Sequence, residues 1–381
     1  MKIAILGFGV VGSGAFEVLS RYGYEVKRVL DIRSHPELKE KLTSNYDDIL
    51  NDDEIKIVAE AIGGLEPAHT FVVKALKAGK HVVSSNKHLI CSYYEELHNL
   101  AKENGVTLRF TSAVGGGIPW LYNLKRSVRC DEISRVMGIM NGTTNFILDA
   151  MITDSREFDD VLREAQALGY AEANPSADID GLDTARKTAI SSSLAFNTII
   201  KEENVKVFPM RTIQKCDIEY IVGRLGRTVR YLGFGVKGDD CISCFVEPAI
   251  LPYHSPEANV VKNFNMITLF GESVGRLSFF GQGAGKYPTG NALAQDIIDI
   301  ANGDTALCFN PTSVKVDNSK CQRKYYIRTS CDATLDCFEQ IETINGNKHI
   351  ITKLINVDMM HELSKIISEK DPASFFAGIE E

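Results

Sequence analysis

Two lysines have residue types nearby that favour proton exchange with a reacting oxygen. Lys187 follows Asp183 by four residues in DTARKTAI, and positions i and i+4 lie on one face of a helix. The carboxylate and the ammonium would therefore point in the same direction. An ammonium that is buried, or that lies near a second ammonium, releases its proton more readily. Taken alone, such a pair is more often a solvent-exposed salt bridge. The second lysine, Lys87, lies in SSNKHLI, directly after a strand-like run.

Acidic residues are concentrated just before Lys187. The block GYAEANPSADIDGLDTARK contains Glu172, Asp178 and Asp180 in addition to Asp183. A pair of carboxylates can hold an α-ammonium group by charge-assisted hydrogen bonds. Two simpler interpretations stay open, because an acidic loop can be merely solvated and because Asp178 or Asp180 can cap the following helix.

Two further stretches are rich in glycine and small polar residues. NGTTNFIL, residues 141–148, would place backbone N–H groups and hydroxyls at a helix N-terminus, which is a natural cradle for a carboxylate. A plain capping turn is the alternative. GQGAGKYPTG, residues 281–290, precedes the helix-like ALAQDIIDI. It either brings backbone close to a ligand or forms a hairpin and a helix entry.

The N-terminus carries a nucleotide-binding pattern. Gly7, Gly9 and Gly12 form GxGxxG directly after a strand-like run and at the start of a helix-like one, and Asp31 follows Gly12 by 19 residues. This spacing is typical of a carboxylate that accepts hydrogen bonds from the adenosine ribose of a dinucleotide. A carboxylate favours NAD because it repels a 2′-phosphate, although Arg33 and Lys27 are close enough in sequence to weaken that preference.

The elements that would position these residues alternate between strand and helix in the first 110 residues. Strand-like runs are Ile3–Leu6, Tyr24–Asp31, Lys56–Ile62, His81–Ser84 and Val106–Phe110, and helical patterns are Val11–Arg21, Pro67–Ala78 and Ser92–Glu103. This order predicts an α/β fold with a doubly wound parallel sheet. The Gly115–Gly117 run and Pro119 indicate the passage into an α+β region.

We predict three domains: residues 1–130, 131–310 and 320–381. The second is α+β, with strands in 207–210, 228–234, 241–246 and 267–270. The third would begin with the strand KYYIRT, continue into the helix DCFEQIETI, and end with another strand and helix.

Composition limits the classes of function. The 381 residues have a net charge of −8 and a pI near 5.6, which argues against a nucleic-acid-binding protein. No apolar run approaches the roughly 20 residues that cross a bilayer, and no signal-peptide pattern opens the chain, so we expect a cytoplasmic protein without membrane contact. The nine cysteines are scattered. Cys241 and Cys244 form one CxxC in a strand-like run, and we interpret them as core residues rather than zinc ligands.

Six stretches in the same order resemble homoserine dehydrogenase over roughly residues 1–302: GFGVVGSG, SNKHLI, VGGGIP, NGTTNFIL, GYAEANPSADIDGLDTARK and GQGAGKYPTGNALAQDI. The resemblance implies a Rossmann domain and a catalytic and dimerisation domain. It also implies reversible reduction of L-aspartate 4-semialdehyde to L-homoserine with NAD or NADP, in threonine, methionine and isoleucine biosynthesis. A homodimer or homotetramer is expected, and the segment near 283–302 would pack back onto the nucleotide domain, completing it to about residue 312.

The resemblance also implies roles for individual residues. Lys187 and Lys87 would handle the proton, with Asp183 supporting Lys187. The substrate would be bound by Glu172, Asp178, Tyr170, Gly142 and Thr143. The cofactor would be contacted by Gly7, Phe8, Gly9, Val10, Val11, Gly12, Asp31, Gly63, Ser84, Ser85, Lys87 and Gly285.

Three departures from the family pattern affect these expectations. Thr111 stands where relatives often carry a glutamate that helps to bind sodium, which leaves the backbone carbonyls of Val114 and Gly116 as possible ligands of a monovalent cation (Na⁺ or K⁺). Leu30 stands where NADP-preferring relatives often carry an arginine, which favours NAD. The C-terminal segment resembles an ACT-type regulatory domain, but it has Cys-Asp-Ala-Thr at 331–334 in place of an Asp-x-Pro-Gly turn. Feedback by threonine is therefore a hypothesis.

Rival functions explain the sequence less well. Aspartate-semialdehyde dehydrogenase needs a cysteine nucleophile, and the nearest candidates, Cys91 and Cys130, lack the glycine-rich context. A nucleotide-sensing regulator without catalysis should have lost the lysines or the acids, and both are present. A purely structural oligomerisation protein does not account for the nucleotide loop.

Overall fold

The computed structural model describes residues 1–304, 311–331 and 335–381. The chain forms two compact units. The first comprises residues 1–130, 193–199 and 281–312, and the second comprises 131–192, 200–280 and 313–381. The domain boundary predicted at residue 310, and residues 332–334 of the Cys-Asp-Ala-Thr stretch, lie outside the described residues. Within the described ranges no helix has the length and apolar character needed to span a membrane.

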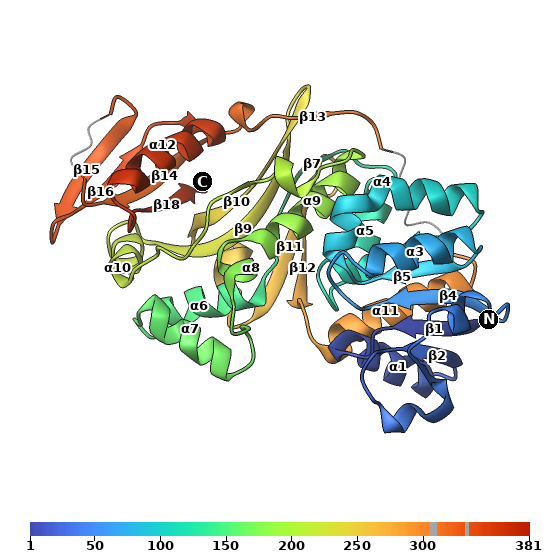
Figure 1. The fold of residues 1–381 in the computed structure, drawn as a ribbon. Coiled ribbons are helices and arrows are strands. Elements are labelled where there is room, and N and C mark those ends of the chain that lie inside the picture. The colour runs from blue at the N-terminus through green and yellow to red at the C-terminus, as the bar shows by residue number, and fades with distance from the viewer. Residues whose placement is uncertain (305–310, 332–334) are drawn as a thin grey trace. The chain divides into compact units, whose positions relative to one another are not determined.

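The first unit is built on a six-stranded parallel sheet in the order β3-β2-β1-β4-β5-β6. Its strands are β1 (Lys2–Leu6), β2 (Val26–Leu30), β3 (Leu42–Thr43), β4 (Ile55–Glu60), β5 (His81–Ser84) and β6 (Leu108–Arg109). Its helices are α1 (Val10–Arg21), α2 (Asp47–Leu50), α3 (Ala68–Lys77), α4 (Lys87–Glu103), α5 (Trp120–Ser127) and α11 (Lys286–Ala301). Figure 1 shows α1 and α11 on one face of the sheet and α3 and α4 on the other. The predicted doubly wound α/β fold is confirmed.

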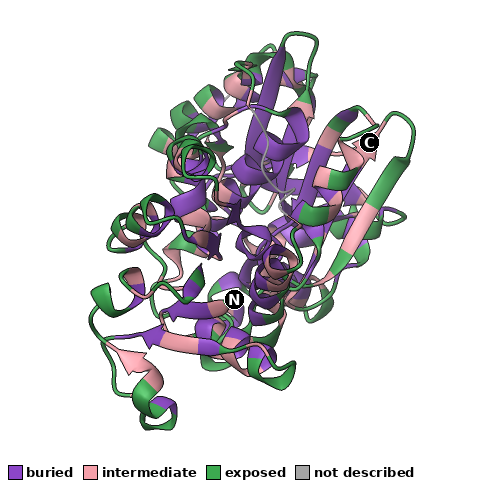
Figure 2. Ribbon diagram, turned by 90° about the vertical axis from the view of Figure 1, so that its right-hand side faces the viewer, coloured by how far each residue is buried: buried purple, intermediate pink, exposed green. Residues whose placement is uncertain are grey.

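Glycines allow α1 and α11 to pack unusually closely. A Cβ on Gly14 would lie 2.1 Å from the Lys286 carbonyl oxygen, and one on Gly290 would lie 2.6 Å from the Ala15 nitrogen. Leu293, Ile297 and Ile300 of α11 are thereby buried with the apolar residues of β1 and α1. Figure 2 shows buried residues concentrated in strands, and helices that carry both buried and exposed residues. The return of residues 281–312 to this unit therefore has a direct packing cause.

The second unit contains a 12-stranded mixed sheet whose main path is β12-β11-β7-β9-β10-β18-β14-β16-β15. Its strands are β7 (Ile133–Ile139), β8 (Lys206–Val207), β9 (Arg227–Lys237), β10 (Cys241–Pro252), β11 (Phe264–Gly271), β12 (Gly275–Gln282), β13 (Lys315–Val316), β14 (Gln322–Thr329), β15 (Phe338–Ile344), β16 (Asn347–Thr352), β17 (Ile355–Asn356) and β18 (Phe375–Ile379). Its helices are α6 (Gly142–Thr153), α7 (Phe158–Ala167), α8 (Ser176–Ile179), α9 (Leu182–Phe196), α10 (Lys215–Gly223) and α12 (Val357–Lys370). The predicted α+β class is confirmed, and Cys241 and Cys244 are buried in β10 as expected.

The helix predicted from DCFEQIETI is wrong, because residues 338–344 form β15. This strand pairs antiparallel with β16. Asn345 and Gly346 join the two strands with φ values of 51° and 83°, the left-handed pair that a two-residue hairpin turn requires. The chain also ends in a strand, β18, rather than in a helix. The described part of residues 320–381 thus has the order β14, β15, β16, β17, α12, β18, which departs from the strand–helix–strand order that suggested an ACT-type domain.

The C-terminal segment continues the sheet of the second unit. β18 pairs in parallel with β10 and antiparallel with β14. A buried ion pair adds to this connection, since Arg328 Nε of β14 donates to Asp217 Oδ1 of α10 at 2.8 Å. The hydroxyl of Tyr326 also donates to Asp217 at 2.8 Å. Residues 313–381 are therefore joined to the rest of the unit by backbone pairing and by a desolvated charge pair.

Candidate functional site

The glycine loop after β1 has the geometry of a dinucleotide-binding turn. Gly7 has φ of 90°, and a Cβ on Gly12 would lie 1.9 Å from the Gly7 carbonyl oxygen. Gly9 precedes α1 without a side-chain cap, so the first N–H groups of the helix stay available for an anion. These features fit a pyrophosphate, and Phe8, Val10 and Val11 belong to the same turn.

Asp31 follows β2 and is held by several donors. Its carboxylate accepts the Phe8 N–H at 2.7 Å, the Arg33 N–H at 2.9 Å and the Arg33 guanidinium at 2.9 Å. The guanidinium holds the pKa of Asp31 well below its usual range. The Arg33 side chain remains 61% exposed. Lys27, in contrast, lies at the other end of β2 and pairs with Asp52 at 2.5 Å, so it does not belong with Asp31.

The remaining predicted cofactor residues follow β4, β5 and β12. Gly63 is exposed and has φ of 81°. Ser84 ends β5, the Ser85 N–H donates to the Glu60 carbonyl at 3.1 Å, and Lys87 is the first residue of α4. The predicted helix thus starts five residues earlier than expected, because Asn86 Oδ1 caps it at the Leu89 N–H. Gly285 precedes α11 with φ of 123°.

In the second unit, Lys187 and Asp183 form a buried pair. The ammonium donates to Asp183 Oδ2 at 2.8 Å and to the Met140 carbonyl at 2.7 Å. Lys187 is 8% exposed and Asp183 is 7% exposed. The pair is therefore desolvated and differs from the exposed surface salt bridge that such spacing usually gives.

Asn141 joins this pair to a third acid, and the sequence did not single out its side chain. Its Nδ2 donates to Asp178 Oδ1 at 2.7 Å and to Asp183 Oδ2 at 2.9 Å. Its Oδ1 caps α6 at the Thr144 N–H. Burial, with the charge of Asp183 as a second cause, raises the pKa of Asp178. The amide thus holds two carboxylates apart while satisfying both.

The other predicted substrate residues lie around the start of α6 and in the acidic loop. Thr143 Oγ1 donates to the Tyr170 carbonyl at 2.6 Å, and a Cβ on Gly142 would lie 2.8 Å from the Asn263 carbonyl oxygen. Glu172 is exposed. Asp180 pairs with the Arg211 guanidinium at 2.5 Å, which gives it a structural role. The capping interpretation of NGTTNFIL is confirmed, since Asn141 caps α6 at the Thr144 N–H, while the cradle for a carboxylate stays a prediction.

The residues of the predicted cation site are buried. The Thr111 N–H donates to Asp296 Oδ2 at 2.8 Å, and Val114 and Gly116 are both buried. Gly116 lies against the 281–285 loop, since its Cβ would come within 2.5 Å of Gly283. Among the residues that the structure describes, no cluster of three or more histidine, cysteine or acidic residues is arranged to hold a metal.

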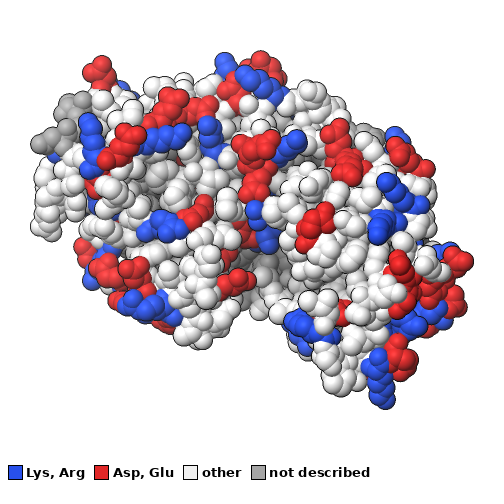
Figure 3. Space-filling model, viewed as in Figure 1, with Lys and Arg blue, Asp and Glu red and all other residues white. Residues whose placement is uncertain are grey.

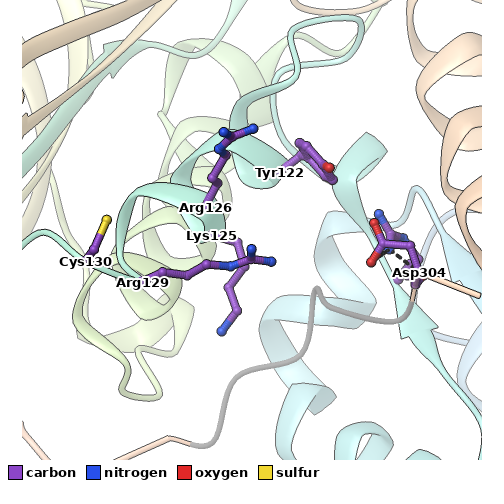
Figure 4. Close-up of a pocket in the computed structure, with 7 residues that line it drawn as sticks. Tyr122, Lys125, Arg126, Arg129, Cys130 and Asp304 are labelled. Atoms are coloured by element: carbon purple, nitrogen blue, oxygen red, sulfur yellow. Dashed lines mark hydrogen bonds and ion pairs between the residues drawn. The ribbon is translucent and has the colours of Figure 1, made fainter.

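A pocket of about 240 Å³ in the first unit lies apart from these motifs (Figure 4). It is lined by Arg109, Tyr122, Lys125, Arg126, Arg129, Cys130 and Asp304. None of the predicted site residues is among them. On the face drawn in Figure 3, acidic and basic side chains are intermingled rather than gathered into one basic surface, in agreement with the net charge of −8.

The glycine turn, the carboxylate after β2 and the parallel sheet define a dinucleotide-binding α/β protein, and a buried lysine–acid group lies in its second unit. Comparison with known proteins agrees. Residues 7–111 match the family model "Homoserine dehydrogenase, NAD binding domain", and residues 119–298 match "Homoserine dehydrogenase". The chain belongs to the homoserine dehydrogenase family and acts as a homoserine dehydrogenase, an oxidoreductase of amino-acid biosynthesis.

Individual relatives cover most of the chain. Homoserine dehydrogenase of Bacillus subtilis is 38% identical, over 79% of this chain and 72% of the relative. That of Pseudomonas aeruginosa is 33% identical, over 92% and 86%. The crystal structure of a homoserine dehydrogenase from Thiobacillus denitrificans superimposes with a TM-score of 0.89 at 30% identity, covering 100% of this chain and 98% of that one. A hyperthermophilic archaeal homoserine dehydrogenase in complex with NADPH gives 0.69 at 26% identity, covering 81% and 99%.

Proposed function

We propose that Lys187 is the residue that exchanges a proton with the substrate oxygen as L-homoserine and L-aspartate 4-semialdehyde interconvert. The observation that carries this proposal is the burial of its ammonium between the Asp183 carboxylate and the Met140 carbonyl. Bound nicotinamide supplies or accepts the hydride. The aldehyde oxygen that receives a hydride becomes an alkoxide and needs a proton, and an ammonium held in a fixed direction supplies it. Asp183 orients Lys187, and Lys87, the first residue of α4, is the second lysine that we assign to proton exchange.

Asp178 and Glu172 bind the substrate ammonium in this proposal. The partial burial that raises the pKa of Asp178 also strengthens its attraction to a cation, because solvent screens the pair less than it would at the surface. Glu172 is exposed, and so it is accessible to a ligand. Tyr170, Gly142 and Thr143 complete the substrate site around the start of α6.

A test of the central role compares Lys187→Ala with Lys206→Ala. Lys206 is a matched control because it lies in the same unit with its side chain 47% exposed. Losing a general acid lowers turnover by about 10²–10⁴-fold, so we expect Lys187→Ala to lose turnover while keeping its affinity for the dinucleotide. The rate is followed by absorbance of the reduced nicotinamide, and affinity by fluorescence titration. Near-normal turnover in Lys187→Ala would refute the role.

We further propose that NAD is the preferred cofactor. The Asp31 carboxylate is buried and ionised, so it favours ribose hydroxyls over a phosphate. Arg33 is the residue through which NADP can be accepted, since its exposed guanidinium already lies on Asp31. Asp31→Ala should therefore lower the ratio of NAD to NADP affinity, and Arg33→Ala should raise it. An unchanged ratio in both variants would contradict the ribose assignment.

Three further proposals concern the cellular location, the assembly and a bound cation. The protein works in the cytoplasm, it assembles as a homodimer or homotetramer, and a monovalent cation binds the carbonyls of Val114 and Gly116. Light scattering after size-exclusion chromatography tests the assembly, where a monomeric mass would contradict it. Exchange of sodium for a large organic cation tests the cation site, where unchanged activity and thermal stability would contradict it.

A further inference from the structure

Glu60 is a buried carboxylate that neither the motifs nor the reaction accounts for. It is the last residue of β4, it is fully buried, and it pairs with Ser84 across the sheet. The carboxyl ends of parallel strands are the edge at which doubly wound sheets bind their ligands. A charge that is buried at this edge costs free energy unless every lone pair is used, so its contacts indicate its purpose.

The two oxygens of Glu60 serve two different loops. Oε1 accepts the N–H of Ile62 at 2.9 Å and of Gly63 at 3.2 Å. Oε2 accepts the hydroxyl of Ser84 at 2.6 Å. The first loop leaves β4 with a positive φ at Gly63, and the second leaves β5. One carboxylate therefore fixes the exits of both strands.

The hydrogen bonds continue from Ser84 to the start of α4. Ser84 Oγ accepts the Asn86 N–H at 3.1 Å. The Asn86 amide then donates to the Gly64 carbonyl at 2.6 Å, which closes a ring between the two loops, and its oxygen caps α4. Lys87 is the first residue of that helix. Its backbone position consequently depends on the ring that starts at Glu60.

We propose that Glu60 is a positioning residue, which holds the Gly63 loop and the backbone of Lys87 in the arrangement that the nicotinamide half of the dinucleotide needs. This inference rests on the proposed function for the role of Lys87. Burial raises the pKa of Glu60, and the donors from Ser84, Ile62 and Gly63 oppose that rise. Each of these donors would lose its partner if the carboxylate were removed.

The test uses Glu60→Ala, Glu60→Gln and the control Lys80→Met in the full chain. Lys80 is 4% exposed and donates to the carbonyls of Asp52 and Ile55, so it stabilises the opposite, amino end of β4. Glu60→Gln keeps an acceptor for Ile62 and Gly63 and alters only the bond to Ser84. A general loss of stability would affect the control and Glu60→Ala alike, whereas a positioning role would separate them.

Hydrogen–deuterium exchange of the free protein is the first readout. We expect faster exchange in peptides covering 61–66 and 84–90 for Glu60→Ala, a smaller change for Glu60→Gln, and none there for Lys80→Met. The second readout is the affinity for NAD, which should weaken on the order of ten-fold in Glu60→Ala, with kcat/KM falling roughly 10²-fold because the lysine is displaced.

The outcomes separate this inference from the proposed role of Lys187. Unchanged exchange in a folded Glu60→Ala protein overturns the inference, whatever Lys187→Ala does. Faster exchange with unchanged affinity for NAD also overturns it, because the loops would then not serve the cofactor. If Glu60→Ala does not fold, Glu60→Gln decides, since it alters only the bond between Glu60 and Ser84. Unchanged exchange and unchanged affinity for NAD in Glu60→Gln would again overturn the inference.

Discussion

Asn141→Asp is the substitution that most directly tests the arrangement of acids around Lys187. The Asn141 amide donates to Asp178 at 2.7 Å and to Asp183 at 2.9 Å, and the residue is 5% exposed. Aspartate has nearly the same shape and still caps the Thr144 N–H. It replaces a double donor by an acceptor, however, and so brings three carboxylates together in a buried place.

The expected penalty follows from these distances. Two unit charges about 2.8 Å apart repel by roughly 6 kcal/mol at an effective dielectric constant near 20. Protonation of one of these carboxyl groups costs less than this repulsion, namely about 1.4 kcal/mol for each pH unit above the ordinary carboxyl pKa of about 3.9. The carboxyl group that takes up the proton therefore has a higher pKa in the folded state than in the unfolded state. The loss of stability consequently grows as the pH rises. It amounts to about 4 kcal/mol near pH 7 and about 2 kcal/mol near pH 5.5.

Thermal unfolding measured across this pH range tests the estimate. The matched control is Asn356→Asp, because Asn356 caps α12 at the Met359 N–H and has no carboxylate partner among the hydrogen bonds of the described residues. We expect the stability difference between Asn141→Asp and the parent protein to narrow as the pH falls, together with recovery of kcat/KM for homoserine. The control should show no such trend. A pH-independent difference for Asn141→Asp would refute the close placement of two carboxyl groups against this side chain.

Three further predictions concern packing and the C-terminal segment. Gly14→Ala should destabilise the first unit by about 1–3 kcal/mol through overpacking, because the new Cβ meets the Lys286 carbonyl. The control Gly223→Ala places its Cβ where nothing lies within 4 Å, so it should leave the melting temperature nearly unchanged. Equal shifts of the melting temperature in the two variants would contradict the close contact between α1 and α11. Arg328→Met should lower the free energy of unfolding by about 3–5 kcal/mol, because it leaves Asp217 buried without its cation. The decrease should be smaller when Arg328→Met is combined with Asp217→Asn, and a double-mutant cycle measures the difference. Saturating L-threonine should lower the rate or raise the melting temperature if the C-terminal segment is regulatory, and no change in either would count against feedback.

The local patterns of the sequence were sufficient for the nucleotide turn and for the lysine–aspartate pair. Gly7, Gly12 and Asp31 belong to one strand–helix–strand unit, so their geometry depends on a short stretch of chain. Lys187 and Asp183 lie one helical turn apart, and the helix alone brings them together. The Asn345–Gly346 turn was equally local and predicts a hairpin. The helix expected at 336–344 was an error in the interpretation of the sequence rather than a limit of it.

Only the tertiary structure decided which side chains meet across the chain. Asn141 reaches Asp178 and Asp183 over 37 and 42 residues, and Glu60 reaches Ser84 over 24. Whether Lys187 is buried or solvated depended on the same long-range packing. Such contacts are set by strand order and by the loops that follow the strands, which no spacing along the sequence records. The chemical groups could therefore be named from the sequence, while their partners, and with them their electrostatics, came from the fold.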